Sequence, residues 1–526
     1  MKLRKSKAHL ILSSVHLGAS EDIVKIYANV AGYYDASVYH LGATLTDKES
    51  KEYVRLQRSL EVANARADQS EREADILRNE TIAAAIESRL KDIQAEESER
   101  IQSLTDNFGK MTLVVSRRGC TDHLDTHKSV EIVDDGIELS KYMFLSAVQT
   151  TTDRNTNNPI SRNARNHLKR HNRYSYVVAH PVPSIQTLPK PGLNEAHSYY
   201  TVGSLRHVET PEHFSEFYKV SHMPCAVLVL IDTETGEFHA KQLHIDYLTK
   251  KGGMPSSPVV LDDGLVFRPI GKPQEVESDD KATLSTDDHA PHQHPGTLGC
   301  LRALNTLHRP GTFINNGDAG EFGSVNRHTK ERPGDREGMR LVDDLSSVER
   351  LLNAQCNTKS IKRRILVDSN HHEWVTLFVS ENPSLKGMTD WETIAKRPSF
   401  AGWDVMIRDE GEPRLFYFGD FLIRHGDQEN LQNGAEMSDS GKYACGHYHR
   451  FNAFQRAVMI GCGRDLGPGF TANQINSWIS MTTSLTKCRG ITAINPKVVL
   501  HDKTRPVSRF AYRNAIYEVD HFKIAM

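Results

Sequence analysis

Short strand-like runs recur along this chain, and polar residues follow most of them directly. Near the N-terminus, Leu10-Ile11-Leu12 ends in Ser13-Ser14, and Ser37-Val38-Tyr39 forms a second run. In the second half, such runs stand at 282–284, 312–314, 364–367, 415–418 and 443–445, each before a polar cluster. Polar residues at successive strand ends of an α/β sheet meet along one edge. The sequence therefore predicts an α/β protein with a site at a sheet edge.

The interval from Thr44 to Phe108 follows a different pattern. It contains neither Gly nor Pro, and Ile82, Ile86, Leu90 and Ile93 recur at helical spacing. This pattern predicts one or two long, charged helices. A narrow apolar stripe on a long helix needs a partner. The segment is therefore either a solvated helical hairpin or an arm for oligomerisation, and we expect a homo-oligomer.

Two turn-rich stretches separate the halves of the chain. The apolar run 226–231, a turn at 232–236 and an alternating run at 238–247 predict a hairpin. Pro and Gly then cluster at 250–258, and an acidic segment ends near Lys281. We therefore expect a first domain over 1–250 with a helical insertion at about 44–108, a linker over 251–281, and a second domain over 282–526.

Bulk properties exclude several classes of protein. The net charge of the 526-residue chain is -2, so any surface that attracts nucleic acid must be local. Its seven cysteines are scattered without a CxxC pair, which argues for a reducing compartment and against a zinc ribbon. The sequence contains no signal-peptide pattern and no run of about 18 apolar residues. We expect a cytoplasmic protein without a membrane partner.

Five polar clusters in the second half offer metal-ligating side chains. Their carboxylates, amide and imidazoles are the oxygen and nitrogen ligands that suit Mn²⁺, Fe²⁺ or Zn²⁺. One such cluster alone is usually a turn or a surface feature, but five in order indicate a shared site. The clusters are Asp287-Asp288-His289, Gly317-Asp318, Asn370-His371, His425-Gly426-Asp427 and Gly446-His447-Tyr448-His449.

These residue types can hydrolyse phosphate esters. Asp318 can bridge two cations, because each carboxylate oxygen can bind a different ion and Gly317 lets the backbone turn sharply beside it. Two cations about 3.5–4 Å apart lower the pKa of a bridging water and hold a phosphate in line for attack. His371, next to Asn370, would then be free to protonate the leaving oxygen.

The clusters resemble the motifs of the calcineurin-like metallophosphoesterase superfamily over about residues 282–526. The family pattern is Asp-x-His, Gly-Asp-x-x-Asp, Gly-Asn-His followed by an acid, a later His, and Gly-His-x-His. The resemblance implies a β-sandwich flanked by helices that holds two divalent metal ions, Mn²⁺ foremost, with Mg²⁺, Fe²⁺ or Zn²⁺ as alternatives. It implies one metal on Asp287, His289 and His449, a second on Asn370, His425 and His447, and Asp318 as the bridge.

The chain departs from the family pattern at three places. Ser369 replaces the Gly before Asn370, Glu321 stands at the second Asp of Gly-Asp-x-x-Asp, and His372-Glu373 follow His371. The last two departures leave the contacts around the metals open. Two further residues, Arg327 and His328, are weaker candidates for contacting a substrate phosphate.

The first half carries traces of the same motifs. Ser14 aligns with Asp287 and Ala43 with Asp318, with separations of 43 − 14 = 29 and 318 − 287 = 31 residues. His180 similarly aligns with His447, and Val182 with His449. We therefore expect two tandem metallophosphoesterase-like domains, of which the first is degenerate and lacks a metal site. The alternative is two unrelated α/β domains.

The resemblance implies a phosphate ester as substrate, and we expect DNA. The superfamily includes SbcD-like nucleases, and large phages carry members, so a phage-encoded protein would act in the host cytoplasm. Basic residues near Tyr174 and at 359–364 fit a surface that follows a nucleic-acid backbone. Two alternatives stay open: a phosphoprotein or cyclic-nucleotide phosphatase, and a scaffold that binds a protein partner through residues 1–250 with catalysis secondary.

Overall fold

The computed structural model has a mixed α/β fold with several sheets. It describes residues 1–13, 20–41, 47–70, 72–115, 129–134, 136–147, 164, 173–180, 182–189, 196–203, 205, 223–249, 255–326, 333–407, 415–426, 431–467 and 477–523. Within these ranges, no helix combines the length and the apolar character needed to cross a membrane.

Two six-stranded sheets share one strand order. In each sheet, four parallel strands lie beside an antiparallel hairpin, which in the first sheet is the hairpin expected at 226–247. The first sheet contains β12 (Phe238–His244), β11 (Cys225–Asp232), β2 (Ser6–Ser13), β3 (Ser37–Leu41), β4 (Met111–Val115) and β5 (Val130–Asp134). The second contains β27 (Ile491–Val498), β26 (Met481–Cys488), β17 (Lys281–Ser285), β18 (Thr312–Asn315), β19 (Arg363–Leu366) and β20 (Trp403–Val405).

A ten-stranded sheet packs against both of these sheets and joins the two halves of the chain. Its first half is β6 (Gly136–Ser140), β7 (Met143–Ser146), β8 (Ser175–Ala179), β10 (Ala196–Val202) and β9 (Ser184–Pro189). Its second half is β24 (Asn452–Phe454), β25 (Ala457–Met459), β23 (Tyr443–Cys445), β22 (Phe421–Ile423) and β21 (Phe416–Phe418). At the centre β9 and β24 pair antiparallel, with Ile185 opposite Ala453. Buried residues of all three sheets form one continuous core.

Two four-stranded sheets exchange strands between the halves. In one, β13 (Asp246–Thr249), β14 (Pro255–Asp262) and β15 (Leu265–Phe267) are completed by β16 (Gln274–Glu275) from the start of the second half. In the other, β28 (Leu500–His501), β29 (Val507–Tyr512) and β30 (Ala515–Asp520) are completed by β1 (Lys2–Arg4) from the start of the first. Strands β1–β15 therefore correspond one to one, in order and pairing, with β16–β30.

The linker expected at 251–281 is folded structure wherever it is described. Residues 255–267 form β14 and β15, and Val259 and Val260 are fully buried. Pro255 begins β14, Pro258 lies within it, and Gly264 lies in the turn before β15. The pairing of strands changes from the first half to the second after Phe267, inside the interval in which the sequence predicted the linker.

In each half, one helix of 14 residues covers a four-stranded sheet. The two helices take the same place in the chain order, since one lies between β2 and β3 and the other between β17 and β18. Helix α1 (Glu21–Tyr34) packs Ile23 and Tyr27 against a core that includes Phe267 of β15. Helix α6 (Pro295–His308) packs Cys300 and Leu304 against β29 and β30. The other described helices of the second half, α7 (Leu341–Gln355), α8 (Asn370–Glu381), α9 (Trp391–Ile394) and α10 (Leu431–Glu436), surround its sheets.

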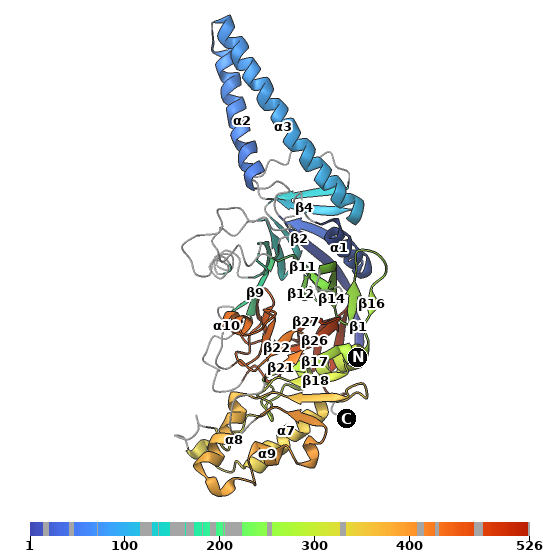
Figure 1. Ribbon diagram of the computed structural model, residues 1–526, viewed down its shortest axis with the longest axis vertical. Coiled ribbons are helices and arrows are strands. Elements are labelled where there is room, and N and C mark those ends of the chain that lie inside the picture. Colours follow the sequence, from blue (N-terminus) through green and yellow to red (C-terminus); the bar gives the residue numbers. More distant parts are fainter. Residues whose placement is uncertain are drawn as a thin grey trace.

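The predicted charged helices form a hairpin that projects from one end of the molecule (Figure 1). Helix α2 (Asp47–Asp68) and helix α3 (Glu73–Phe108) pack through an apolar seam that includes Tyr53, Leu90 and Ile93. At its base, α3 buries Ile101 and Leu104 beside the first six-stranded sheet. The helical prediction is confirmed, and the hairpin inserts between β3 and β4.

His308 joins α6 to two sheets and makes stability depend on pH. Burial lowers the pKa of His308 to about 3. Its ring lies 3.2 Å from the Tyr512 hydroxyl, and its Nε2 donates to the Leu485 carbonyl oxygen at 3.1 Å. Above pH 6.5 the ring is neutral in the folded and unfolded chain alike. Between pH 6.5 and 3 only the unfolded chain binds the proton, so the free energy of unfolding should fall by about 1.4 kcal/mol per pH unit from this group.

The variant His308→Gln should remove this dependence. Urea unfolding at pH 7.5, 6 and 5 should show a pH slope smaller by about one proton than that of the wild type. If the free energy of unfolding changed with pH equally in the variant and the wild type, His308 would not be the source of this pH dependence.

Candidate metal centre

The predicted ligand residues leave the carboxyl ends of neighbouring strands in the second half. Asp287 and His289 follow β17, Asp318 follows β18, and His425 follows β22. Asn370 and His371 begin α8, and His447 and His449 lie between β23 and β24. The strand directly before His425 is β22. The apolar run at 415–418, which the sequence predicted to precede this cluster, forms β21 instead. The structure brings seven of these side chains together in groups whose ligand atoms lie within 4.8 Å: Asp287, His289, Asp318, His371, His425, His447 and His449.

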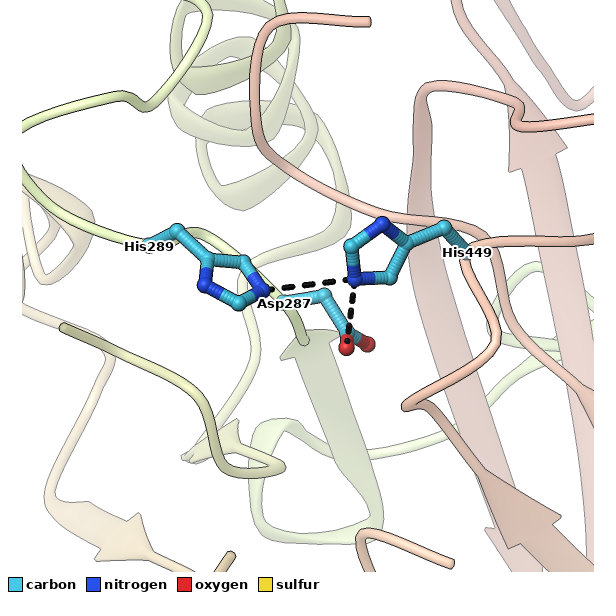
Figure 2. A group of neighbouring side chains, drawn as sticks. All are labelled: Asp287, His289 and His449. Carbon is cyan, nitrogen blue, oxygen red and sulfur yellow. Dashed lines mark hydrogen bonds and ion pairs between the residues drawn. The ribbon is translucent and has the colours of Figure 1, made fainter. Parts of the chain in front are cut away.

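One group of ligand atoms is formed by Asp287, His289 and His449 (Figure 2). The Nε2 atom of His449 lies 3.1 Å from Asp287 Oδ1 and 3.3 Å from His289 Nε2. Ligand atoms bound to one cation at about 2.0–2.2 Å lie roughly 3–3.5 Å from each other. The three side chains are therefore spaced to share one ion.

Asp318 links this group to a second one. Its Oδ2 lies 3.1 Å from Nε2 of His425 and 3.7 Å from Nε2 of His289. Asp318, His425 and His447 form one set of ligand atoms within 4.8 Å of one another, and His289, Asp318 and His371 form another. A single carboxylate thus faces both sides of the site, which is the position a bridging ligand requires.

Hydrogen bonds fix which ring nitrogen of His425 and of His371 faces the centre. Nδ1 of His425 donates to the Asn316 carbonyl oxygen at 3.0 Å, and Nδ1 of His371 donates to that of Glu321 at 3.1 Å. Nδ1 of His289 lies 2.9 Å from the Glu321 carboxylate. Donation at Nδ1 leaves the Nε2 lone pair directed inward, the arrangement that metal-binding histidines need.

The buried site concentrates negative charge. Burial alone would raise the pKa of Asp287, but contact with His449 outweighs it and lowers the pKa to about 2. Burial lowers the pKa of His289 to about 4, so this ring is neutral at pH 7. Burial also acts to lower the pKa of His425, but the Asp318 carboxylate raises it to about 10. Without a cation, the Asp318 carboxylate therefore holds a proton on His425, and a bound cation would displace that proton.

The backbone is strained at most of the ligand positions. Asp287, His289, Asp318, His447 and His449 all have positive φ, between 48° and 67°. Non-glycine residues rarely adopt this region, and such residues cluster at functional sites. The strain turns short side chains inward from strand ends. Gly446 is required by space as well, because a Cβ there would lie 2.3 Å from Asp287 Oδ2.

The residues present fit two divalent cations. Asn370 Oδ1 is buried without a hydrogen-bond partner, although buried amide oxygens are normally satisfied. An oxygen ligand of a cation at this position would account for it. The donor set contains only nitrogen and oxygen atoms, which agrees with the metals expected from the sequence. The identity of the ions stays a prediction.

Sequence reasoning missed the supporting residues of the site. Glu321, read as a departure from the family pattern, contacts His289 and lies 3.5 Å from the Arg464 guanidinium. Ser369, another departure, accepts a hydrogen bond from the Asp318 backbone N–H at 2.9 Å. Contacts of this kind join residues that are distant in sequence, so spacing carried no signal for them. Arg327, His328, Asp427, Ser14 and Ala43 lie outside the described residues.

Comparisons with known proteins add little. No family model matches the chain, and no curated protein matches it. A solved structure, Vps29 of Chaetomium thermophilum, matches 50% of this chain and 98% of its own length, at 10% identity and a TM-score of 0.25. Vps29 has a calcineurin-like metallophosphoesterase fold. The TM-score of this match is too low to assign a fold to this chain.

Replacing the Asp318 carboxylate, which two groups of ligand atoms share, should weaken metal binding by both groups. Asp318→Asn keeps the side-chain shape but removes the charge that faces His425 and His289. We expect Mn²⁺ titrated by calorimetry to bind at least 100-fold more weakly to this variant. The exposed Asp279→Asn, a matched loss of charge far from the site, should bind as the wild type does. Equal affinity of Asp318→Asn and wild type would contradict the assignment.

Glu321→Gln should test the orientation of His289 separately. An amide at this position has no charge to hold Nδ1–H, so Nε2 would face the centre less often. The expected loss of metal affinity is about 10- to 100-fold, with the stoichiometry retained. Mn²⁺ titration followed by electron paramagnetic resonance would measure both quantities.

Proposed function

We propose that the second half of the chain is a phosphoesterase that uses two divalent metal ions. The observation that carries this proposal is the position of Asp318 between two sets of ligand atoms that share it. Two such ions, when bound, would supply positive charge to activate a water and to stabilise the phosphate during in-line attack. Asp287, His289 and His449 would hold one ion, and Asn370, His425 and His447 the other.

His371 is placed to handle the proton of the leaving group. Its Nε2 lies 3.8 Å from Asp318 Oδ2, and its ring stacks on Trp374 at 3.8 Å between centroids. The backbone N–H of His371 also donates to Asp318 Oδ1 at 3.2 Å. With Nδ1 held by Glu321 and the ring held by Trp374, Nε2 can carry a proton to an ester oxygen bound at the centre.

The substrate we propose is a phosphodiester, and within that class DNA. The half-buried His447 leaves the centre open on one side, which suits a polymer better than an enclosed pocket would. The resemblance of the motifs to nucleases supports the same choice. The basic segment 359–364 does not add support, because it precedes β19 at the opposite edge of the sheet and Lys362 and Arg363 pair with Asp279 and Asp404.

We further propose that the first half is a degenerate copy of the second. This is supported by the one-to-one correspondence of β1–β15 with β16–β30, including the antiparallel hairpins and the exchanged strands. His180, aligned with His447, follows β8 as His447 follows β23. The proposed role of this half is to complete the sheets that carry the active loops.

Hydrolysis assays should decide between substrate classes. With Mn²⁺, the wild type should cleave plasmid DNA and bis-p-nitrophenyl phosphate, and cleave p-nitrophenyl phosphate more slowly. Asp318→Asn should lose about a thousandfold or more in kcat, and His371→Asn about 10²–10⁴-fold. Parallel reactions with Mg²⁺ and Zn²⁺ would rank the metals.

Two results would count against the proposal. Activity confined to the monoester would remove the nuclease assignment and favour a phosphatase. Activity that survives in Asp318→Asn would remove the two-metal centre altogether. His371→Asn should still bind Mn²⁺ through the other ligands, so metal titration separates a lost proton donor from a lost site.

A further inference from the structure

The helical hairpin carries a groove that the catalytic proposal does not use. A cavity of about 650 Å³ lies between residues 54–66 of α2 and the N-terminal part of α3. Arg55, Arg58 and Arg66 line it, and its lining contains no acidic residue. Among the described residues, none of these three arginines forms an ion pair. The groove is therefore lined by basic residues that form no ion pair within the described part of the chain.

Apolar side chains stand exposed along the same part of the hairpin. Val62 of α2 and Ile82 of α3 line the groove and are 49% and 43% exposed. Exposed apolar side chains gathered on one element indicate a contact surface. Phosphate groups alone would not cover them, whereas a helix with apolar and acidic positions would.

Such a helix face exists on α3 itself. Glu73, Leu77, Glu80, Ala84 and Glu87 follow each other at intervals of four and three residues, so they form one stripe, and all are exposed. Helix α3 has nine acidic and four basic residues, a net charge of 4 − 9 = −5. Its outward stripe is therefore acidic, with Leu77 and Ala84 as the apolar positions.

The stripe and the groove lie on opposite sides of α3. Glu80 and Ala84 are each two residues from Ile82, which places them about 160–200° away around the helix. A hairpin therefore cannot fill its own groove with this stripe. Two copies related by a twofold axis would instead face groove to groove and bring arginines together.

We infer that the groove of one chain binds the acidic stripe of α3 from a second copy, head to tail. Arg58 and Arg66 are eight residues apart, about 12 Å along α2, and Glu80 and Glu87 are seven apart, about 10.5 Å along α3. The charges can therefore pair when α3 of the second copy lies parallel to α2, Arg58 with Glu80 and Arg66 with Glu87. A head-to-tail contact repeats from copy to copy, so it builds a ring or a chain of more than two subunits.

Charge reversal tests this contact in the full-length protein. Light scattering after size exclusion, at about 0.1 M salt, should give a wild-type mass above that of a dimer. Arg58→Glu and Glu80→Arg should each weaken assembly by about tenfold or more, because each puts like charges in contact at every interface. Glu99→Arg, the same change at an exposed position outside the stripe, is the matched control and should assemble as the wild type does.

Restoring the pair provides the decisive measurement. The double variant Arg58→Glu/Glu80→Arg should assemble again, as should a mixture of the two single variants. A monomeric or strictly dimeric wild type would overturn the proposal, as would reversal variants that assemble normally or a double variant that stays apart. Circular dichroism of each variant would exclude unfolding, since all the changed positions are exposed.

Discussion

The pairing of β9 with β24 is the contact on which the two halves depend. Each strand would otherwise be the open edge of a five-stranded sheet, with unpaired N–H and C=O groups beside a hydrophobic core. The pairing is reinforced by side chains: Ser184 donates to the Ala453 carbonyl oxygen at 2.9 Å, and Asn452 accepts from the Thr187 backbone N–H at 2.9 Å. In the four-stranded sheets, β1 of the first half pairs with β30 of the second, and β16 of the second half pairs with β15 of the first. Neither half therefore has a complete set of sheets without the other.

This arrangement explains how a strained loop can hold two of the proposed ligands. His447 and His449 lie between β23 and β24, and both have positive φ. Such strain persists only where the surrounding structure fixes the chain. Here β24 is fixed by β9 from the first half, and the Ile479 backbone N–H donates to the His449 carbonyl oxygen at 2.9 Å. A half that has no described metal cluster can thus still be required for the geometry of the site.

Much of the local structure could be predicted from residue patterns. Apolar periodicity identified the helices at 47–108, and alternation identified the hairpin at 226–247, because both patterns reflect burial of one face. The order of the polar clusters identified the residues that converge at the strand ends. The turn-rich composition at 250–258 did not indicate β14, because Pro255 begins that strand and Pro258 lies within it. The contact of Glu321 with His289 was not predictable, since it depends on side-chain directions after folding.

The sequence by itself determined which side chains are available for chemistry and which strand precedes each of them. Those properties are local: a carboxylate after a glycine, or an imidazole after a buried strand, is encoded within a few residues. Only the tertiary structure decided that β1 pairs with β30 and β9 with β24, and that Asp318 faces His425 and His289 together. These pairings join segments separated by up to about five hundred residues, and many alternatives would bury similar apolar area. The packing of all the sheets around one core selects among them.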